Sequence, residues 1–360
     1  MKKLVLGFLA LGSILSVSAQ QTKVLTAEKH NEYGIVYSLP NTALKIQVVA
    51  RTEVKKAGPY NQYAKRYLGT TNVIAEDEVN TSIVSVRVTP VGIQNTDDKY
   101  LMQLKAGATT FVGVDENGML LSINAQPEAP VVETVAMAVA APTSTGDLEE
   151  YLQYVDMDFL SAQSSLKQAE MISNSMMDVR DAYLSLTRGT ADNVPTDGRQ
   201  MELMLNSLKA QEAAFTRAFA GTVSTREFTS EYLYIPEKNG EAVLFRLSNF
   251  EGFVDADDYS GFPVYISTEI TAEGKLPKDA DGIEKKLPKD AVIYAIPGSA
   301  RIKIYTDRGN LYEQEFEFAQ FGTTFGLNPT LFTDKKAPSF ATFSPVTGGL
   351  LEIGKVTATE

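Results

Sequence analysis

The sequence predicts an α+β protein in which two related, mainly antiparallel β domains, sandwich-like in character, flank an inserted antiparallel helical hairpin. Three observations predict this class: a nine-residue segment that occurs twice, alternating apolar residues near both ends of the chain, and a long helical seam in the middle. The segment Ile35–Ala43 returns as Val292–Ala300. An apolar-Lys-apolar strand follows each copy, so we expect each copy to begin a strand pair.

Each copy of the repeat contains a proline followed by asparagine or glycine, Pro40-Asn41 in the first copy and Pro297-Gly298 in the second. A type II turn favours this pairing, because proline presets φ at about −65° and asparagine or glycine enters positive φ at low cost. We therefore predict a tight turn in each copy. We interpret each copy of the repeat as the start of a β unit and not as part of an active site.

The N-terminus predicts export. Two lysines precede an apolar run from Leu4 to Leu15, and Val17-Ser18-Ala19 offers a small-x-small cleavage site. This is the pattern of a secretory signal peptide, to which we assign residues 1–19. No later apolar stretch approaches the ~20 residues that a transmembrane helix requires. We therefore expect a soluble, exported protein without a transmembrane segment.

The composition excludes several functions. The 360 residues include no cysteine and carry a formal net charge of −12. Without cysteine, thiol catalysis and cysteine-ligated zinc are excluded, and an exported chain must rely on core burial instead of disulfides. An acidic surface repels nucleic acid, so no nucleic-acid partner is expected. The length favours two or three domains over one.

Residues 20–123 form the predicted N-terminal β domain with one short helix. Apolar residues at positions 44, 46 and 48 alternate with polar ones, as in a half-buried strand. Asn117-Gly118, between two apolar runs, predicts a β-hairpin. The helix is expected between Gly58 and Gly69, since Pro59 suits a first helical turn and glycine a C-terminal stop.

Residues 124–146 are the predicted linker, because they hold three prolines and show no clean period. Residues 147–221 then form the predicted helical hairpin. Its first arm carries a coiled-coil-like seam, and its second arm restarts at Asp197 after a break from Gly189 to Pro195. A break this short makes the two helices antiparallel neighbours. The seam comprises Leu166, Ala169, Ile172, Met176, Val179, Tyr183 and Leu186.

Residues 222–360 form the predicted C-terminal β domain, whose best-defined part is the hairpin after the second repeat copy. A three-residue loop from Arg308 to Asn310 gives a register that hydrophobicity and charge both select. It places Ile302 opposite Phe316, Lys303 opposite Glu315, and Arg301 opposite Glu317. A short tandem repeat, Lys275–Ala280 and Lys286–Ala291, is expected in an exposed loop, as a small duplication or as a recognition loop.

The ionisable residues form no catalytic motif. The single histidine, His30, lies among polar residues near the mature N-terminus and is expected to be a surface residue. The chain contains neither a nucleophile elbow nor a phosphate-binding glycine loop. We therefore assign no catalytic residue and no cofactor.

Two acidic runs remain as candidate sites. Asp255, Asp257 and Asp258 lie together in one predicted loop, and Glu76, Asp77 and Glu78 form the second run. Either run could supply oxygen ligands to calcium, and either could consist of solvated loop acids. Neither run matches an EF-hand, so the sequence leaves metal binding open.

A stripe of tyrosines is the other candidate binding surface. Tyr60, Tyr63 and Tyr67 share one face of the short helix predicted from Gly58 to Gly69. The stripe could bind a partner, because tyrosine combines a large contact area with a hydroxyl. The alternative is that it packs against the adjoining sheet.

Several segments together resemble a family of exported Bacteroidota proteins that is defined only as a domain of unknown function. The most specific of them is the Gly58-Pro59-Tyr60 helix, and the similarity spans nearly the whole mature chain. The resemblance implies the envelope of a Gram-negative cell, either the periplasm or the outer membrane as an associated protein, and it implies no activity. The segments are Tyr37–Pro40, Lys56–Tyr60 with Tyr63, Ala64 and Tyr67–Gly69, Val73-Ile74, Met201–Leu205 and Ala319–Gly322.

These observations favour a non-enzymatic binding or scaffolding module of the cell envelope with a protein partner there, its oligomeric state left open. The alternative is a carboxylate-dependent hydrolase acting on envelope or dietary glycans, which would need Asp257 or Asp258 to converge with another buried acid in a cleft. A third hypothesis, calcium-stabilised adhesion, predicts a melting temperature that falls on chelation.

Overall fold

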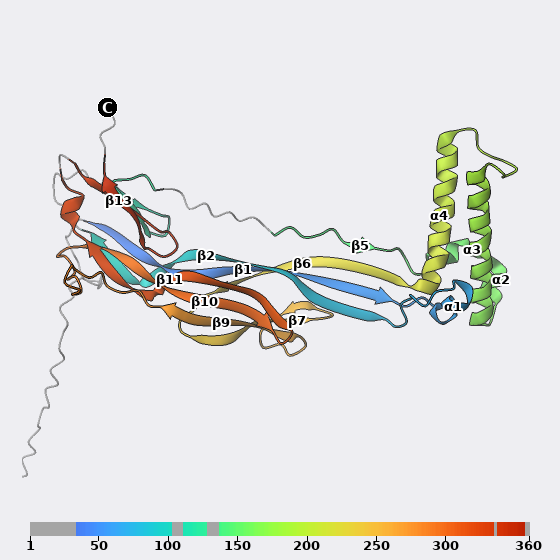
Figure 1. Ribbon diagram of the computed structural model, residues 1–360, viewed down its shortest axis with the longest axis horizontal. Helices are drawn as coiled ribbons and strands as arrows, with labels where there is room; N and C mark the ends of the chain where they lie inside the picture. Colours follow the sequence, from blue (N-terminus) through green and yellow to red (C-terminus); the bar gives the residue numbers. More distant parts are fainter. Residues whose placement is uncertain (1–33, 103–110, 128–136, 335–336, 357–360) are drawn as a thin grey trace, which may run out of the picture.

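The computed structural model describes residues 34–102, 111–127, 137–334 and 337–356, and the molecule is elongated (Figure 1). It is mainly antiparallel β structure, with 46% strand and 22% helix. Three sheets occupy one end and the middle of the molecule, and a helical unit forms the other end. Within the described residues, no helix is both long and apolar enough to cross a membrane.

The first sheet is built around β1 (Ile35–Lys56) and has the order β2-β1-β6-β5. β1 pairs antiparallel with β2 (Glu78–Met102) on one side and with β6 (Thr222–Tyr234) on the other, and β5 (Thr143–Ser144) adds to the edge of β6. At about 3.3 Å per residue, the 22 residues of β1 span roughly 70 Å. β1 therefore runs from the third sheet toward the helical unit (Figure 1).

The second sheet has the order β11-β10-β9-β7-β8 and shares an apolar core with the first. The alternation that the sequence predicts is confirmed, because Leu44, Ile46 and Val48 of β1 are fully buried in this core. Phe245 stacks on Tyr232 with ring centroids 4.7 Å apart, which joins the two sheets. The strands are β7 (Gly240–Ser248), β8 (Gly252–Val254), β9 (Phe262–Ala272), β10 (Val292–Thr306) and β11 (Gly309–Leu327).

The third sheet has the order β13-β12-β4-β3 and lies at the end of the molecule opposite the helices (Figure 1). Its strands are β3 (Val112–Val114), β4 (Leu120–Ile123), β12 (Ser339–Phe343) and β13 (Leu350–Lys355), and a 3₁₀ turn, Pro329–Leu331, precedes β12. β3 and β4 pair across the turn that Asn117-Gly118 predicts.

The helical unit lies beyond the far end of β1. The long helices α3 (Ser165–Arg188) and α4 (Gly198–Ala220) lie side by side and run in opposite directions (Figure 1). Gly189 ends α3 with φ 70°, and the Asp197 carboxylate accepts a hydrogen bond from Arg199 N at the start of α4. The shorter elements are α1 (Ala64–Tyr67), α2 (Met157–Ser161) and 3₁₀ turns at Asn61–Tyr63 and Glu150–Tyr154.

The strands of the two predicted β domains share their sheets. β6, from residues 222–360, pairs with β1, and β12, from the same segment, pairs with β4 of residues 20–123. The segment predicted as a linker, 124–146, contributes β5 to the first sheet. The hydrophobic pattern of a strand shows which face is buried but not which strand it pairs with. The pairing of β6 with β1 and of β12 with β4 therefore could not be predicted from the sequence.

The prediction of a type II turn in each repeat copy is wrong. Pro40 and Pro297 lie inside the continuous strands β1 and β10, and neither Asn41 nor Gly298 has positive φ. Proline has no N–H to donate, so it interrupts the ladder and favours a bulge. In both copies one residue of the proline-containing strand faces four residues of its partner: Leu39 faces 95–98 on β2, and Pro297 faces 319–322 on β11.

The predicted register of the β10–β11 hairpin is wrong by two residues. Ile302 lies opposite Gln314, Lys303 opposite Glu313, and Arg301 opposite Glu315. The loop has two residues, because Thr306 pairs with Gly309, and a one-residue bulge at Leu311 follows. A shift of two residues keeps every side chain on its predicted face, so hydrophobic pattern alone could not detect the error.

The helix predicted from Gly58 to Gly69 is shorter than expected. It consists of a 3₁₀ turn followed by the four-residue α1, and it packs on the helical unit instead of the sheet. Gly58 lies so close to α4 that a Cβ would sit 2.5 Å from the carbonyl oxygen of Ala218. This close approach, together with the hydrogen bond from Tyr60 N to the same carbonyl, holds the segment against α4.

The side chain of Tyr37 in the first repeat copy forms hydrogen bonds with the backbone of the second copy. Its hydroxyl donates to the carbonyl oxygen of Ile293 at 3.1 Å and accepts from the Ile293 N–H at 2.7 Å, and the side chain is almost fully buried. Burial raises the pKa of Tyr37 well above the ordinary tyrosine value. The corresponding tyrosine of the second copy, Tyr294, is half-buried and packs edge-on against Phe325.

Gln320 of β11 connects the first and second sheets. Its side chain accepts from Thr42 N at 3.0 Å and donates to Thr42 O at 2.8 Å and to Pro236 O at 3.0 Å. The hydroxyl of Thr42, which is fully buried, donates to Val346 O at 3.0 Å near the third sheet. The pair Thr42 and Gln320 therefore forms a polar node, which we call the Thr42–Gln320 node, between all three sheets.

We expect Tyr37→Phe to lower the free energy of unfolding by about 2–4 kcal/mol, because it leaves both backbone groups of Ile293 buried without a partner. Tyr294→Phe is the matched control and should change stability by less than about 0.5 kcal/mol. Urea unfolding checks both values, and equal losses in the two variants would contradict a stabilising role for the Tyr37 hydrogen bonds.

The same variant predicts a pH dependence. The pKa of Tyr37 is raised in the folded state, so the neutral hydroxyl contributes stability below the unfolded pKa of about 10, and this contribution is lost as pH rises above it. From pH ~9 to pH ~11 the wild type should therefore lose stability more steeply than Tyr37→Phe. Parallel curves in urea titrations would show that Tyr37 does not carry the effect.

We expect Gln320→Leu to lower the free energy of unfolding by about 2–5 kcal/mol, since it leaves the N–H and C=O of Thr42 without side-chain partners. Gln314→Leu, on the exposed part of the same strand, is the control and should stay within about 0.5 kcal/mol of the wild type. A small loss at position 320, measured by urea unfolding, would mean that the node is dispensable.

Candidate functional site

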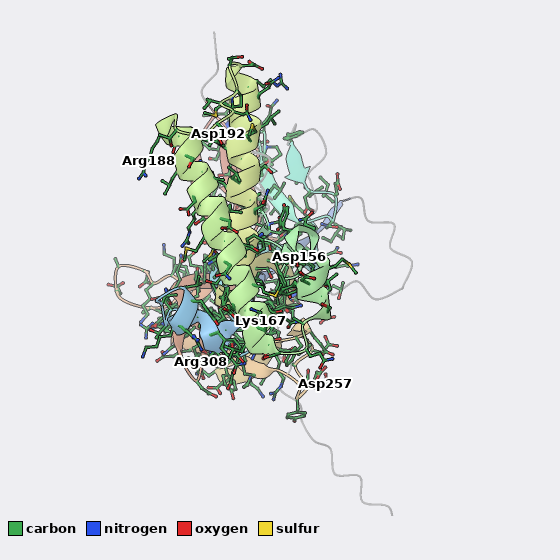
Figure 2. All side chains as sticks on the ribbon, turned by 90° about the vertical axis from the view of Figure 1, so that its right-hand side faces the viewer. Asp156, Lys167, Arg188, Asp192, Asp257 and Arg308 are labelled. Carbon is green, nitrogen blue, oxygen red and sulfur yellow. The ribbon has the colours of Figure 1, made fainter. Side chains whose placement is uncertain are left out.

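The three aspartates of the first acidic run lie exposed in the loop between β8 and β9. Asp257 lies at the periphery of the molecule when it is viewed from the helical end (Figure 2). The backbone of Asp258 donates to Asp255 O at 3.0 Å, and the Asp258 carboxylate accepts from Ser260 N at 2.9 Å. This N–H, with a smaller contribution from Arg246, lowers the pKa of Asp258. The hydrogen bonds of Asp258 thus stay within its own loop.

The second acidic run lines a groove of about 560 Å³ where β1 ends. The Asp77 carboxylate accepts from Ala57 N at 2.8 Å, and Glu78 forms an ion pair with Lys55 at 3.2 Å. These two acids therefore fasten the loop to β1. Within the described part of the chain, no three His, Cys, Asp or Glu side chains are placed to share a metal ion.

The tyrosine stripe packs on the helical unit. Tyr60 is 5% exposed and meets Tyr151 and Phe159 edge-on, and burial raises its pKa. Tyr63 shares a hydrogen bond with Ser165 at 3.0 Å, and Tyr67 packs against Phe219. The structure thus brings the three tyrosines together in a packing contact between the end of β1 and the helices, well away from Asp255, Asp257 and Asp258. His30 lies outside the described residues.

The short tandem repeat lies in the exposed loop between β9 and β10, as the sequence predicts. The carboxylate of Asp279 accepts from Asp281 N at 3.0 Å and from Ile283 N at 2.9 Å. The loop is therefore organised by its own hydrogen bonds.

A further groove lies on the first sheet and has a volume of about 620 Å³. We call it the arm groove. It is lined by the ends of β1 and β6, by β5 and by the turn between β7 and β8. The lining residues are Thr52, Val54, Pro142, Thr143, Ser144, Ser224, Thr225, Arg226, Phe228, Phe250, Glu251 and Gly252.

The floor of the arm groove continues the core face of the first sheet. In the β1–β6 register, Ala50 lies opposite Phe228, Thr52 opposite Arg226, and Val54 opposite Ser224. Side chains two residues apart on a strand point to the same face. Leu44 to Ala50 are covered by the second sheet, whereas Thr52 and Val54 lie in the groove. On the groove floor, this face of the first sheet therefore carries polar side chains, Thr52, Ser224 and Arg226, beside the apolar side chains Val54 and Phe228.

One wall of the groove is the turn that carries Phe250, and hydrogen bonds fix this turn. Asn249 accepts from Thr81 N through its side chain at 3.0 Å and from the Thr81 hydroxyl through its carbonyl oxygen at 2.9 Å. The Thr81 hydroxyl also lies 2.8 Å from that of Thr52 on the groove floor. Thr81 is fully buried, so the anchor is rigid, yet Phe250 itself is 85% exposed.

The close packing of Gly252 also holds the turn in place. Gly252 has φ 78°, and a Cβ there would lie 2.8 Å from the ring of Phe228. Only glycine therefore fits this position without displacing the aromatic floor. The glycine contact and the two hydrogen bonds of Asn249 therefore hold Phe250 at a fixed place beside the groove.

The charges on the two faces of the first sheet differ. On the face opposite the groove, Arg51 pairs with Glu227 at 2.5 Å and Lys45 with Glu231 at 2.9 Å. The pKa of Glu227 is lowered chiefly by the hydrogen bond from Ala140 N–H and, to a smaller extent, by Arg51. The same hydrogen bond connects the segment before β5 to β6. On the groove face, Arg226 has no ion pair or hydrogen bond to any residue that the structure describes. Among the described residues, nothing therefore occupies its five N–H donors.

Sequence reasoning missed Phe250 and Arg226. Asn249–Gly252 is a turn sequence, and a phenylalanine inside a turn is the one signal that could have drawn attention to it. No sequence signal distinguishes Arg226, because a polar residue at this position is expected on the exposed face of any strand. The groove arises from pairing between segments more than 160 residues apart in sequence, which no local pattern predicts.

Comparison with known proteins adds a family but no activity. A family model described as "Domain of unknown function (DUF4831)" matches residues 33–351, which is nearly the whole chain. No curated protein and no solved structure matches it. The arrangement of the arm groove is therefore the starting point for assigning function.

We expect Asn249→Ala to loosen the turn that carries Phe250. The substitution leaves Thr81 N without its acceptor and should lower the free energy of unfolding by about 1–2 kcal/mol. Hydrogen exchange of the amides at 249–252 should accelerate more than exchange elsewhere. Asn310→Ala, at the exposed β10–β11 turn, is the control and should change neither value; unchanged exchange at 249–252 would show that the turn does not depend on Asn249.

Proposed function

The chain belongs to the family described as Domain of unknown function (DUF4831), and we propose that it is a non-enzymatic binding or scaffolding module of the cell envelope. The observation that carries the proposal is the arm groove, in which a fixed turn exposes Phe250 beside an arginine without a partner among the described residues. Aromatic residues, phenylalanine included, and arginine are enriched at binding interfaces relative to the rest of the surface.

The shape of the molecule supports a scaffolding role. β1 separates the third sheet from the helical unit by a span of roughly 70 Å, and the arm groove lies near its helical end. Arg188 and Asp192 lie at the tip of the helical pair, far from the sheets (Figure 2). A partner held in the groove would therefore sit at a defined distance from anything held at the third sheet.

We also propose that the repeat copies belong to two related β units, consistent with a sandwich-like arrangement. Equivalent residues of the two copies make equivalent contacts: Ser38 bridges Met119 in parallel, and Ala295 bridges Gly349 in parallel. Ser38 N donates to Gly118 O at 2.9 Å, and Ala295 N donates to Gly348 O at 3.0 Å. Both proline bulges have the same size, which supports a common origin by duplication.

The alternative function is that of a carboxylate-dependent hydrolase acting on envelope or dietary glycans. It needs a carboxyl group placed against a second, buried acid. Asp257 and Asp258 are exposed at the edge of the second sheet, and the backbone N–H of Ser260 holds the pKa of Asp258 low. A low pKa suits a carboxylate that accepts hydrogen bonds and does not suit a general acid at neutral pH. This geometry favours the binding module.

Location in the envelope belongs to the same proposal. The support is the sequence pattern of residues 1–19, which lie outside the described part of the chain. A periplasmic protein or one associated with the outer membrane of a Gram-negative bacterium fits that pattern. Fractionation of the native host with an antibody to the chain tests the location directly, and recovery in the cytoplasmic fraction would overturn it.

The experiment that tests the proposal is site-specific photo-crosslinking in the native cell. p-Benzoylphenylalanine replaces Phe250 in the groove, and Tyr259 serves as the matched control because its ring is 84% exposed on a neighbouring loop outside the groove. We expect a discrete adduct from position 250 that position 259 does not form. Asn249→Ala, which frees the turn, should weaken this adduct.

Two outcomes would contradict the arm groove as the binding site. One is the same set of adducts from both positions, which would indicate random collision. The other is an adduct obtained only from Leu203, a 62% exposed position on α4, which would place the partner on the helical unit.

A further inference from the structure

The arm groove holds three kinds of group in one open site. It presents an exposed aromatic ring, a guanidinium without a partner among the described residues, and a floor and side wall of hydroxyls. Resting on the proposed function, we propose that the groove binds an acidic sugar chain, with one pyranose ring on Phe250 and its carboxylate on Arg226. Phe250, Arg226 and the groove lining each support this ligand class.

Phe250 supplies a platform that needs no rearrangement. The turn is tied to the buried Thr81 by two hydrogen bonds, and its amides at 250 and 251 both donate to the Ser248 hydroxyl at 3.4 Å. The face of an aromatic ring carries partial negative charge, so it attracts the polarised C–H groups on the face of a sugar ring. Because the backbone of the turn is already fixed in the free protein, binding need not order this segment of the chain.

Arg226 selects the charge of the ligand. It lies opposite Thr52 on the groove face, while the basic residues Lys45 and Arg51 on the other face are neutralised by glutamates. The Glu251 carboxylate accepts from the Ser260 hydroxyl at 3.4 Å, which directs it toward the neighbouring loop. In a protein of net charge −12, a guanidinium that no described residue neutralises is the feature that makes this groove attractive to an anion. A planar carboxylate matches its bidentate donor geometry.

The remaining lining favours a hydroxyl-rich ligand over a peptide strand. The hydroxyl residues on the groove face are Thr52, Ser144 and Ser224, since Ser144 lies opposite Ser224 and Thr52 lies opposite Arg226. A hydroxyl can both donate and accept a hydrogen bond, as a sugar hydroxyl requires. β5 already occupies the edge of β6 at Ser224 and Thr225. That part of the sheet therefore offers no free ladder for an added strand.

The test uses the mature chain and isothermal titration calorimetry with three defined probes. Oligogalacturonate supplies the acidic sugar, its methyl ester supplies the same rings without charge, and oligo-L-glutamate supplies the charge without the rings. We expect oligogalacturonate to bind about tenfold or more tightly than the ester, and increasing salt to reduce the difference.

The variants separate the two contacts. Arg226→Gln should abolish the preference for the acid over the ester, and Phe250→Ala should weaken both sugars about tenfold. Arg199→Gln on α4 and Tyr259→Ala outside the groove are the matched controls and should bind like the wild type. All four positions are exposed, so unchanged melting temperatures will show that the variants are folded.

Equal affinity for the acid and the ester, or no binding of either sugar, would overturn the proposal. Binding of oligo-L-glutamate with the same dependence on Phe250 and Arg226 would assign the groove to acidic peptides and would equally overturn it. If the sugars fail while the adduct from position 250 persists, the binding module stands and only its ligand class is wrong. If both fail, the arm groove is not a binding site.

Discussion

The arrangement of the three sheets depends on the Thr42–Gln320 node. A fully buried threonine on β1 has both backbone groups bonded to one amide side chain of β11, while its hydroxyl bonds the segment before β13. Each group would be costly to bury alone, so the sheets are stable only when all three meet. The node exists because Pro297 interrupts the β10 ladder and leaves Ala319–Gly322 outside it, which turns the amide of Gln320 toward β1.

The repeat and the Thr42–Gln320 node both depend on the irregular strand pairing beside Pro40 and Pro297. Pro40 and Pro297 stand at equivalent places, and both ladders accommodate them by the same one-against-four bulge. The β11 segment that bulges opposite Pro297 binds the first copy at Thr42, and Tyr37 of the first copy binds the second copy at Ile293. The irregular pairing at Pro297 thus places a side chain that bonds the first copy.

Local patterns in the sequence predicted local structure well and tertiary pairing poorly. The alternation at Leu44, Ile46 and Val48, the turn at Asn117-Gly118 and the caps at Gly189 and Asp197 each depend on neighbours in sequence, and the structure contains all of them. The pairing of β6 with β1 and the register of β10 with β11 depend on bulges and on distant partners. Phe250 and Arg226 were missed for the same reason, since they meet only through sheet pairing, and the tyrosine stripe packs on the helical unit.

The long-range pairing of β1 has a kinetic consequence. Its partner β6 begins 166 residues after the end of β1, and the hydrogen bond from Thr42 to Gln320 closes a loop of 278 residues. Closing such loops costs conformational entropy before the contacts that repay it can form, so folding should be slow and should wait for the last third of the chain. Slow folding of this kind would keep the chain unfolded after synthesis begins, which is the state that the export proposed above requires.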